Sequence, residues 1–300
     1  MAIVSVENLK MSYDKGRVKA LKGVTFDVEE GEIFGLIGPD GAGKTSLFRI
    51  LTTLLLADSG KAVVDGMDVV NDYKKIRQHI GYMPGRFSLY QDLTVEENLS
   101  FFATVFNTTI EENYHLVEDI YRQIEPFKKR KAGKLSGGMK QKLALSCALI
   151  HAPHVLFLDE PTTGVDPVSR KELQKLKKNF KLSIVVSTPY MDEALQCDRI
   201  ALIQDGQFLT IDTPENIIRT YTQTLWSLRS DKMHKLLTDL RGIDGVKTAF
   251  AFGENHHATI DTSVLTVDSL RNRLVSLGHR NIVIEVVEPT IEDCFMNLQK

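Results

Sequence analysis

The chain has few cysteines, little net charge and no long apolar run. Its 300 residues include three cysteines, too few and too far apart for a disulfide framework or a metal-binding knuckle: Cys147, Cys197 and Cys294. A formal net charge of −2 gives no general attraction to nucleic acid, and the basic run at 128–131 lacks interleaved aromatic residues, so we expect no nucleic-acid partner. No apolar run approaches about 18 residues. We therefore expect no transmembrane segment, and the alternating first residues predict a strand rather than a signal peptide.

One stretch has the pattern of a phosphate-binding loop. It reads GPDGAGKTS, follows the apolar run Ile33–Ile37 and precedes an apolar helix candidate from Leu47 to Leu56. A strand, a glycine loop and a helix in this order are the context that G-x-x-x-x-G-K-[ST] needs to bind a nucleotide. The glycines let successive N–H groups point at an anion, and the helix N-terminus adds a partial positive charge. The alternative, a glycine turn that binds nothing, is disfavoured by the flanking strand and helix.

We assign nucleotide binding to the whole loop: Gly38, Pro39, Asp40, Gly41, Ala42, Gly43, Lys44, Thr45 and Ser46. Lys44 is expected to reach the β- and γ-phosphates, and the hydroxyl of Thr45 to ligate Mg²⁺. Tyr13 lies in an early turn, where its ring is either a surface aromatic or a platform for adenine. The sequence leaves these two interpretations of Tyr13 open.

Two later segments add an anion-binding position and a pair of acids. Ser136-Gly137-Gly138 starts a helix with apolar residues three and four apart, so it resembles a second helix N-terminus suited to an anion. The apolar run Val155–Leu158 ends in Asp159 and Glu160, and such a run predicts a buried parallel strand whose carboxyl end binds ligands. Asp159 is expected to hold Mg²⁺, and Glu160 to orient or deprotonate the attacking water.

The order of predicted elements indicates two domains. Residues 1–222 alternate strands and helices as an α/β domain, with a helical subdomain at about 86–150. Residues 223–300 follow the order β-α-β-β-α-β, which resembles a small α+β ferredoxin-like sandwich. His256 and His257 are expected in a hairpin turn of this second domain, solvated rather than bound to a metal.

Together these motifs resemble the ATP-binding cassette (ABC) subunit of a transporter, over residues 1 to about 222. The loop matches the Walker A motif, and three further segments match the ABC signature, the Walker B strand with its catalytic glutamate, and the D-loop: Leu135–Lys142, Val155–Glu160 and Gly164–Asp166. The resemblance implies a P-loop NTPase fold, with ATP and Mg²⁺ as cofactors and Tyr13 at the adenine-stacking position. It also implies that two cassettes dimerise head to tail, so that each ATP lies between one P-loop and the other chain's Ser136-Gly137-Gly138.

Other segments are similar to a narrower group, the ABC-2-type exporters, whose cassette is a separate chain. These include Tyr190–Ala194 and the ending Glu288–Asp293. This resemblance implies a peripheral ATPase subunit at the cytoplasmic face of the bacterial inner membrane. Paired with a membrane permease and a second cassette, it would drive efflux of a substrate such as a drug.

Two positions depart from the family pattern. Gly85 stands where the family usually has a glutamine that helps to ligate Mg²⁺, and Pro189 where it usually has a histidine that contacts the γ-phosphate. Proline offers no side-chain hydrogen bond. These two positions therefore keep open a catalytically weak module paired with a second, active cassette. A further alternative is a non-transport ABC ATPase, but such proteins usually carry a long coiled coil or two cassettes on one chain, and this chain has neither.

Overall fold

The chain folds as two compact units. The structure, a computed structural model, describes residues 2–161 and 170–299 and divides the chain into Met1–Pro214 and Glu215–Lys300. This boundary precedes the one predicted at residue 222, because the segment around α7 (Pro214–Arg219) bonds within the second unit. There, the Cys294 thiol donates to the carbonyl of Ile217 at 3.6 Å, and the Tyr221 hydroxyl lies 2.7 Å from that of Thr259. Within the described residues, no helix has the length and apolar character needed to cross a bilayer.

The first unit combines two sheets with several helices. Its strands are β1 (Ala2–Tyr13), β2 (Val18–Glu29), β3 (Ile33–Ile37), β4 (Ser59–Val64), β5 (Met67–Asp68), β6 (Ile80–Met83), β7 (Val155–Asp159), β8 (Ser183–Thr188), β9 (Arg199–Gln204) and β10 (Gln207–Asp212). Its helices are α1 (Lys44–Leu51), α2 (Tyr73–His79), α3 (Val95–Val105), α4 (Ile110–Tyr121), α5 (Gly137–Leu149) and α6 (Arg170–Phe180), with short 3₁₀ turns at Asp14–Gly16, Glu125–Phe127, Ala132–Lys134 and Met191–Gln196.

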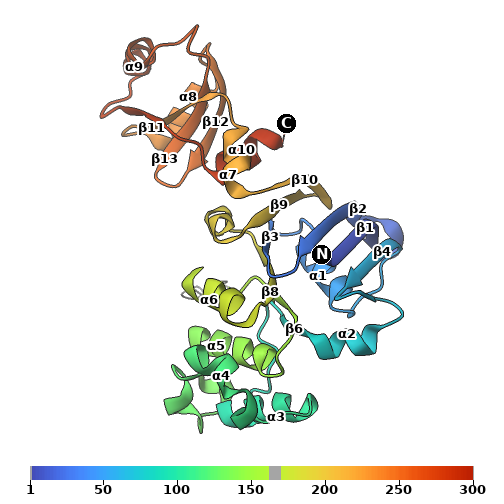
Figure 1. The fold of residues 1–300 in the computed structure, drawn as a ribbon. Coiled ribbons are helices and arrows are strands. Elements are labelled where there is room, and N and C mark those ends of the chain that lie inside the picture. Colours follow the sequence, from blue (N-terminus) through green and yellow to red (C-terminus); the bar gives the residue numbers. More distant parts are fainter. Residues whose placement is uncertain (1, 162–169, 300) are drawn as a thin grey trace. The chain divides into compact units, whose positions relative to one another are not determined.

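The two sheets differ in strand direction. One is antiparallel with the order β2-β1-β4-β5, and the other has the order β10-β9-β3-β8-β7-β6, in which only the β9–β10 pair is antiparallel (Figure 1). Every residue of β3, β7 and β8 is buried, as continuous apolar runs predict for parallel strands covered on both faces. Because parallel strands end at the same edge, the loops after β3, β7 and β8 meet there.

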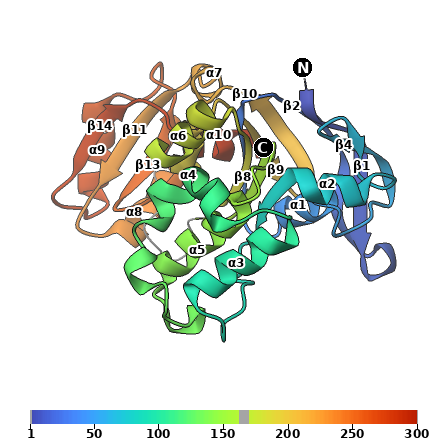
Figure 2. The same cartoon turned by 60° about the horizontal axis from the view of Figure 1, so that its bottom comes forward.

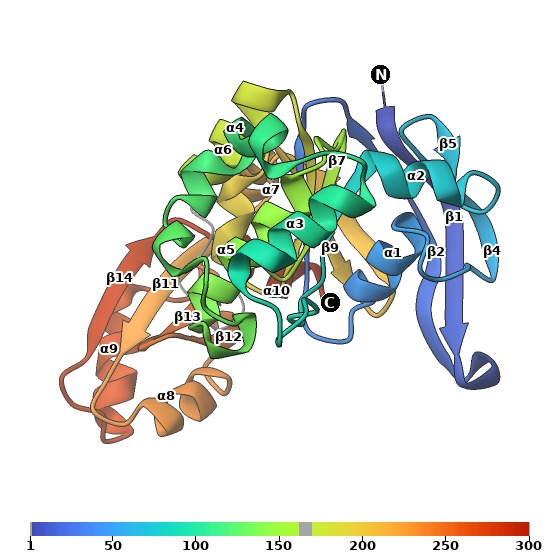
Figure 3. The same cartoon turned by 90° about the horizontal axis from the view of Figure 1, so that it is seen from below.

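Helices fill the space beside these sheets in two groups. Helix α1 lies between the antiparallel sheet and the parallel strands, where Phe48 packs edge-on against Phe157 with ring centroids 5.7 Å apart (Figure 3). Helices α3, α4 and α5 pack on one another between β6 and β7 in sequence (Figure 2). Thr94 and Thr109 start α3 and α4 with complete capping boxes. The predicted α/β class with a helical insertion is therefore confirmed.

The second unit has one antiparallel sheet and a separate core. Its elements after α7 are β11 (Thr224–Arg229), α8 (Met233–Leu240), β12 (Val246–Phe252), β13 (Asn255–Ile260), α9 (Val267–Ser276), β14 (Val283–Val287) and α10 (Ile291–Leu298). The strand order is β12-β13-β11-β14, and every neighbouring pair is antiparallel. Trp226, Leu236 and Leu270 are among the buried residues of its core.

The prediction for His256 and His257 was wrong. Both lie in β13 and are buried, because the turn is made by Gly253 and Glu254 and the strand begins at Asn255. Nδ1 of His257 lies 2.8 Å from Oδ1 of Asp293, and its ring stacks on Phe252 with centroids 4.0 Å apart. The imidazole is thus part of the core of the second unit.

Asp293 is expected to stabilise the second unit, and Asp293→Asn should lower its free energy of unfolding by about 1–3 kcal/mol. Its carboxylate bonds His257 and also accepts from the N–H and hydroxyl of Thr290 at 2.9 and 2.7 Å. Trp226, the one tryptophan of the sequence, is buried in this unit, so its fluorescence reports the unfolding locally. The matched control is Asp268→Asn, at an exposed position in the first turn of α9.

The free energy of unfolding that Asp293→Asn loses should depend on pH. Burial alone would raise the pKa of Asp293, but the hydrogen bonds from His257 and Thr290 outweigh it and hold the pKa below its ordinary value of 3.8. A carboxyl group whose pKa is lowered in the folded state stabilises the fold at pH values above its unfolded-state pKa. This stabilisation is lost as the pH falls through the lower folded-state pKa. The difference between wild type and Asp293→Asn should therefore be full above about pH 5 and shrink as the pH falls below about 4. Equal midpoints for Asp293→Asn and Asp268→Asn would contradict this role.

Candidate nucleotide-binding site

The glycine loop between β3 and α1 has the backbone that anion binding requires. Gly41 and Gly43 have φ of 80° and 108°, in the left-handed region that favours glycine. A Cβ on Gly43 would lie 2.3 Å from the carbonyl oxygen of Ala20, and one on Gly38 would lie 2.1 Å from that of Ile203. Gly43 is also the N-cap of α1 and has no side chain to bond the first-turn N–H groups, which leaves them for an anion.

Lys44 places its ammonium group inside this loop. The side chain is buried, and Nζ donates to the carbonyls of Gly38 and Pro39 at 2.8 and 3.0 Å. Nζ also lies 3.7 Å from Oε1 of Glu160. Burial lowers the pKa of Lys44, while the carboxylate of Glu160 acts in the opposite direction. The cation thus sits among acceptors that a phosphate oxygen is able to replace.

Asp159 lies beside Thr45 at the carboxyl end of β7. The Thr45 hydroxyl is 3.4 Å from Oδ1 of Asp159, so the two predicted Mg²⁺ ligands are brought together. Ser187 at the end of β8 donates to the same Oδ1 at 2.5 Å, because the parallel register pairs Asp159 with Ser187. Sequence reasoning missed Ser187. The sequence feature that could have revealed it is a hydroxyl among the last residues of an apolar strand predicted to be buried.

Glu160 is held next to this pair in an uncommon backbone conformation. Its φ is 51°, a region that few residues other than glycine adopt, and such strain clusters at functional sites. The N–H of Glu160 donates to the carbonyl of Ser187 at 2.9 Å, which fixes the turn. The predicted catalytic carboxylate and the P-loop lysine therefore lie in one site.

Gly85 and Pro189, the two positions that depart from the family pattern, both border this site. A Cβ on Gly85 would lie 3.1 Å from the carbonyl oxygen of Asp159 and 3.6 Å from Cβ of Glu160. Pro189 directly follows Thr188, whose carbonyl accepts from the N–H of Gly38 at 3.2 Å. A glutamine at 85 or a histidine at 189 would thus project from positions next to the P-loop and the acids.

The remaining predicted residues lie in two places. Tyr13 is the last residue of β1 and not part of the turn where it was predicted, because that turn begins at Asp14. Its side chain is partly exposed, and its hydroxyl is 3.0 Å from that of Ser46, so its ring lies near the start of α1. Ser136 caps α5 by accepting from the N–H of Met139 at 3.4 Å, with Gly137 and Gly138 in the first turn. Helix α5 packs against α3, α4 and β6, whereas α1 packs against β2, β4 and β7. The predicted D-loop, Gly164–Asp166, lies outside the described residues.

These residues fit a magnesium–nucleotide complex. The loop offers N–H donors and a buried ammonium group for phosphate oxygens, and Thr45 and Asp159 offer the oxygen ligands that Mg²⁺ prefers. The carboxylate of Glu160 lies close enough to the lysine to face the same bound phosphates.

Comparisons with known proteins agree with this geometry. Residues 21–163 match the family model described as ABC transporter. The chain is 41% identical over 222 residues to "Probable multidrug ABC transporter ATP-binding protein YbhF" of Escherichia coli, covering 71% of this chain and 38% of YbhF. It is 30% identical to "Linearmycin resistance ATP-binding protein LnrL" of Bacillus subtilis, covering 99% of this chain and 98% of LnrL. The chain thus spans well under half of YbhF but nearly all of LnrL.

A solved structure extends the agreement to the fold. The dimeric post-hydrolysis state of the ATP-binding cassette MJ0796, bound to ADP and Pi, superposes with a TM-score of 0.63 at 26% identity. The match covers 70% of this chain and 98% of that one, so it corresponds to a single cassette. The P-loop, the paired acids and the sequence matches lead to one conclusion: this chain belongs to the ABC transporter family, as an ATP-binding cassette with the P-loop NTPase fold.

Proposed function

We propose that this chain binds and hydrolyses ATP as the ATP-binding subunit of an ABC-2-type export complex, and drives efflux of a substrate such as a drug through a separate permease. The observation that supports it most is the meeting of the P-loop with the paired acids, where Lys44 lies 3.7 Å from Glu160 and Thr45 lies 3.4 Å from Asp159. The printed descriptions of YbhF and LnrL as multidrug and linearmycin-resistance ATP-binding proteins support the export role.

The roles of the residues follow from their chemistry. The Tyr13 ring stacks on adenine, the N–H groups of the loop at 38–46 bind the phosphates, and Lys44 neutralises their charge. Thr45 and Asp159 hold Mg²⁺, which when bound neutralises developing charge on the phosphate oxygens. Ser187 keeps Asp159 oriented through its 2.5 Å hydrogen bond. Glu160 accepts a proton from the attacking water.

The site is completed in this proposal by a second cassette. Ser136, Gly137 and Gly138 start α5 with N–H groups suited to a phosphate, whereas the P-loop of the same chain starts a different helix, α1. The dimeric state of MJ0796 supports such a pairing. The second cassette is either a copy of this chain or a different cassette. Both arrangements use the same surfaces of this chain.

A groove of the first unit is the proposed contact with the permease. It has a volume of about 520 Å³, lies beside α3, and is lined by aromatic and apolar side chains with arginines among them: Arg49, Arg77, Met83, Leu89, Phe102 and Phe106. A short amphipathic segment of a membrane protein fits such a lining, since its apolar side fills the groove and its polar side meets the arginines. Docking there would place the chain at the cytoplasmic face of the bacterial inner membrane.

Co-purification tests the export role. When the chain is co-expressed with a candidate ABC-2-type permease, Phe102→Ser should reduce the recovered permease at least about tenfold, because one aromatic anchor buried in the contact contributes more than about 1.4 kcal/mol. ATP binding should be unchanged. The control is Val275→Ser, which removes an exposed apolar side chain from α9 in the second unit. Full recovery with Phe102→Ser would reject the groove, and no recovery with the wild-type chain would reject the transport role.

A further inference from the structure

A second cluster of polar side chains lies at the opposite edge of the parallel sheet. Asp65, His79 and His154 bring one carboxylate oxygen and two ring nitrogens within 4.8 Å of one another. His154 directly precedes β7, whereas Asp159 of the nucleotide site ends it. Since β7 has five residues, about 16 Å of strand separates the two edges. The nucleotide site therefore does not account for this cluster.

The sheet register fixes the two histidines side by side. Ile80 pairs with Val155 in the parallel strands β6 and β7, and each histidine directly precedes one of these residues. The N–H of His154 donates to the carbonyl of His79 at 2.8 Å, and the two rings meet edge to face with centroids 4.9 Å apart. Their adjacency is thus set by the backbone and not by the chance position of two flexible side chains.

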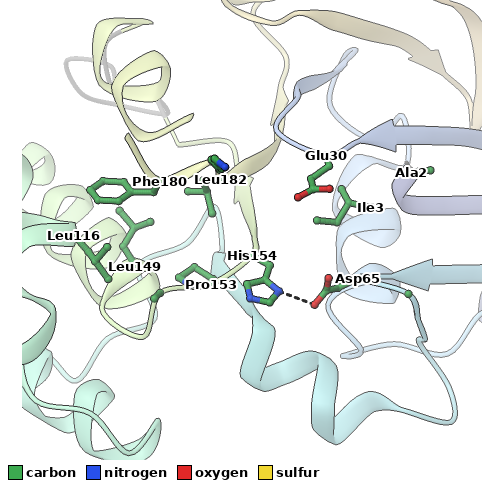
Figure 4. A pocket seen from close by; sticks show the side chains of 13 residues that line it. Ala2, Ile3, Glu30, Asp65, Leu116, Leu149, Pro153, His154, Phe180 and Leu182 are labelled. Atoms are coloured by element: carbon green, nitrogen blue, oxygen red, sulfur yellow. Dashed lines mark hydrogen bonds and ion pairs between the residues drawn. The ribbon is translucent and has the colours of Figure 1, made fainter. Parts of the chain in front are cut away.

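Asp65 reaches the histidines from the turn between β4 and β5. Asp65 and Gly66 have φ of 52° and 72°, and the N–H of Asp65 donates to the carbonyl of Ile3 at 2.7 Å, so the turn is anchored. Its Oδ2 lies 2.6 Å from Nδ1 of His79 and 2.9 Å from Nδ1 of His154. Figure 4 shows the carboxylate of Asp65 and the ring of His154 pointing toward one another.

The cluster borders a cavity and is reachable from solvent. Asp65 and His154 line a cavity of about 660 Å³, whose other walls include Leu149, Phe180 and Leu182 (Figure 4). The side chains of Asp65, His79 and His154 are 21%, 40% and 58% exposed. A ligand of the cluster therefore has an entry path and room for a water molecule beside it.

We propose that Asp65, His79 and His154 bind a divalent transition-metal ion, with Zn²⁺ as the preferred ion and water in the fourth position. Two imidazoles and one carboxylate are the donor set of zinc sites that keep one position open. Mg²⁺ and Ca²⁺ instead prefer sets made only of oxygen, so this site and the nucleotide site select different ions. With both imidazoles neutral the three ligands carry one negative charge, which partly balances the ion.

The ion enters by replacing the contacts between the ligands. Zn–ligand bonds of 2.0–2.1 Å in a tetrahedron place ligand atoms about 3.3 Å apart. The two Nδ1–Oδ2 distances of 2.6 and 2.9 Å therefore lengthen by roughly half an ångström, which small rotations of partly exposed side chains supply. The bound ion then joins the β4–β5 turn of the antiparallel sheet to the residues directly before β6 and β7. It thereby stabilises the folded first unit.

Zinc titration of the full chain tests the proposal. Metal-free protein without nucleotide is titrated with ZnCl₂ in excess Mg²⁺, which occupies oxygen-only sites, and bound zinc is counted after gel filtration. We expect one zinc per chain and a rise in the melting midpoint of about 5–10 °C at a hundredfold excess over Kd. His79→Gln/His154→Gln should lose both effects, and so should Asp65→Asn, whose asparagine tolerates the left-handed turn. His234→Gln, at an exposed position of α8, is the matched control and should keep them.

Two outcomes would overturn the site. One is that the wild-type chain retains no zinc, in which case the carboxylate only bridges two imidazoles. The other is that the histidine double variant and Asp65→Asn bind zinc as the wild type does. Visible absorption of Co²⁺ in place of Zn²⁺ gives an independent readout, since tetrahedral bands should appear with the wild type and not with the double variant.

Discussion

Glu160→Gln is expected to lower single-turnover ATP hydrolysis about 10²- to 10⁴-fold while ATP binding is retained. Glutamine has the size of glutamate but does not accept a proton from the attacking water. The backbone at this position is held by the N–H of Glu160, which donates to the carbonyl of Ser187 at 2.9 Å, and the substitution leaves that bond intact. Lys44 also keeps its two loop carbonyls. The measurement is conversion of labelled ATP with the chain in excess, beside an equilibrium binding titration.

The matched control is Glu96→Gln, which removes a carboxylate from an exposed ion pair with Lys128. It should leave both the rate and the affinity unchanged, because exposed ion pairs contribute little. A Glu160→Gln chain that hydrolyses ATP at the wild-type rate would show that another group activates the water.

Gly85 and Pro189 raise a rival interpretation, in which the ATP site built on this chain's own P-loop hydrolyses ATP slowly. If these residues limit the rate, wild-type turnover is slow, and Gly85→Gln or Pro189→His raises it. Because a Cβ at position 85 would lie 3.1 Å from the carbonyl oxygen of Asp159, Gly85→Ala is needed to separate this crowding from the gain of an amide. Brisk wild-type turnover that neither restoration changes would reject the weak-site interpretation.

The nucleotide site was largely predictable because its signals are local. The strand, glycine loop and helix are contiguous in sequence, and Asp159 and Glu160 directly follow an apolar strand. Ser187 was not predicted as part of the site, because its bond to Asp159 depends on which strands are neighbours. Strand order is a long-range property that periodicity alone does not determine.

The same reason explains the other differences. His257 bonds to Asp293, which lies 36 residues further along the chain, and α7 belongs to the second unit through contacts with Cys294. The cluster of Asp65 and His154 likewise needs the turn after β4 to meet the strand β7 from a different sheet. Each depends on residues far apart in sequence, which the fold alone brings together.

Lys44→Met is expected to weaken ATP binding and to lower hydrolysis about 10²- to 10³-fold, because it removes a preorganised cation from the phosphate-binding loop. The side chain is buried, and in the free protein its ammonium group lies among the carbonyls of Gly38 and Pro39 and the carboxylate of Glu160. Methionine fills a similar volume without a charge, so the fold should tolerate it.

Stability separates loss of function from loss of fold in this variant. Burial lowers the pKa of Lys44, which means that keeping its ammonium group charged costs folding free energy. Lys44→Met should therefore have a melting midpoint within a few degrees of the wild type but show no rise when MgATP is added. Lys75→Met, which breaks an exposed pair with Asp72, is the control and should keep the full rise. A Lys44→Met chain that MgATP still stabilises as strongly as the wild type would mean that the N–H groups of the loop alone hold the nucleotide.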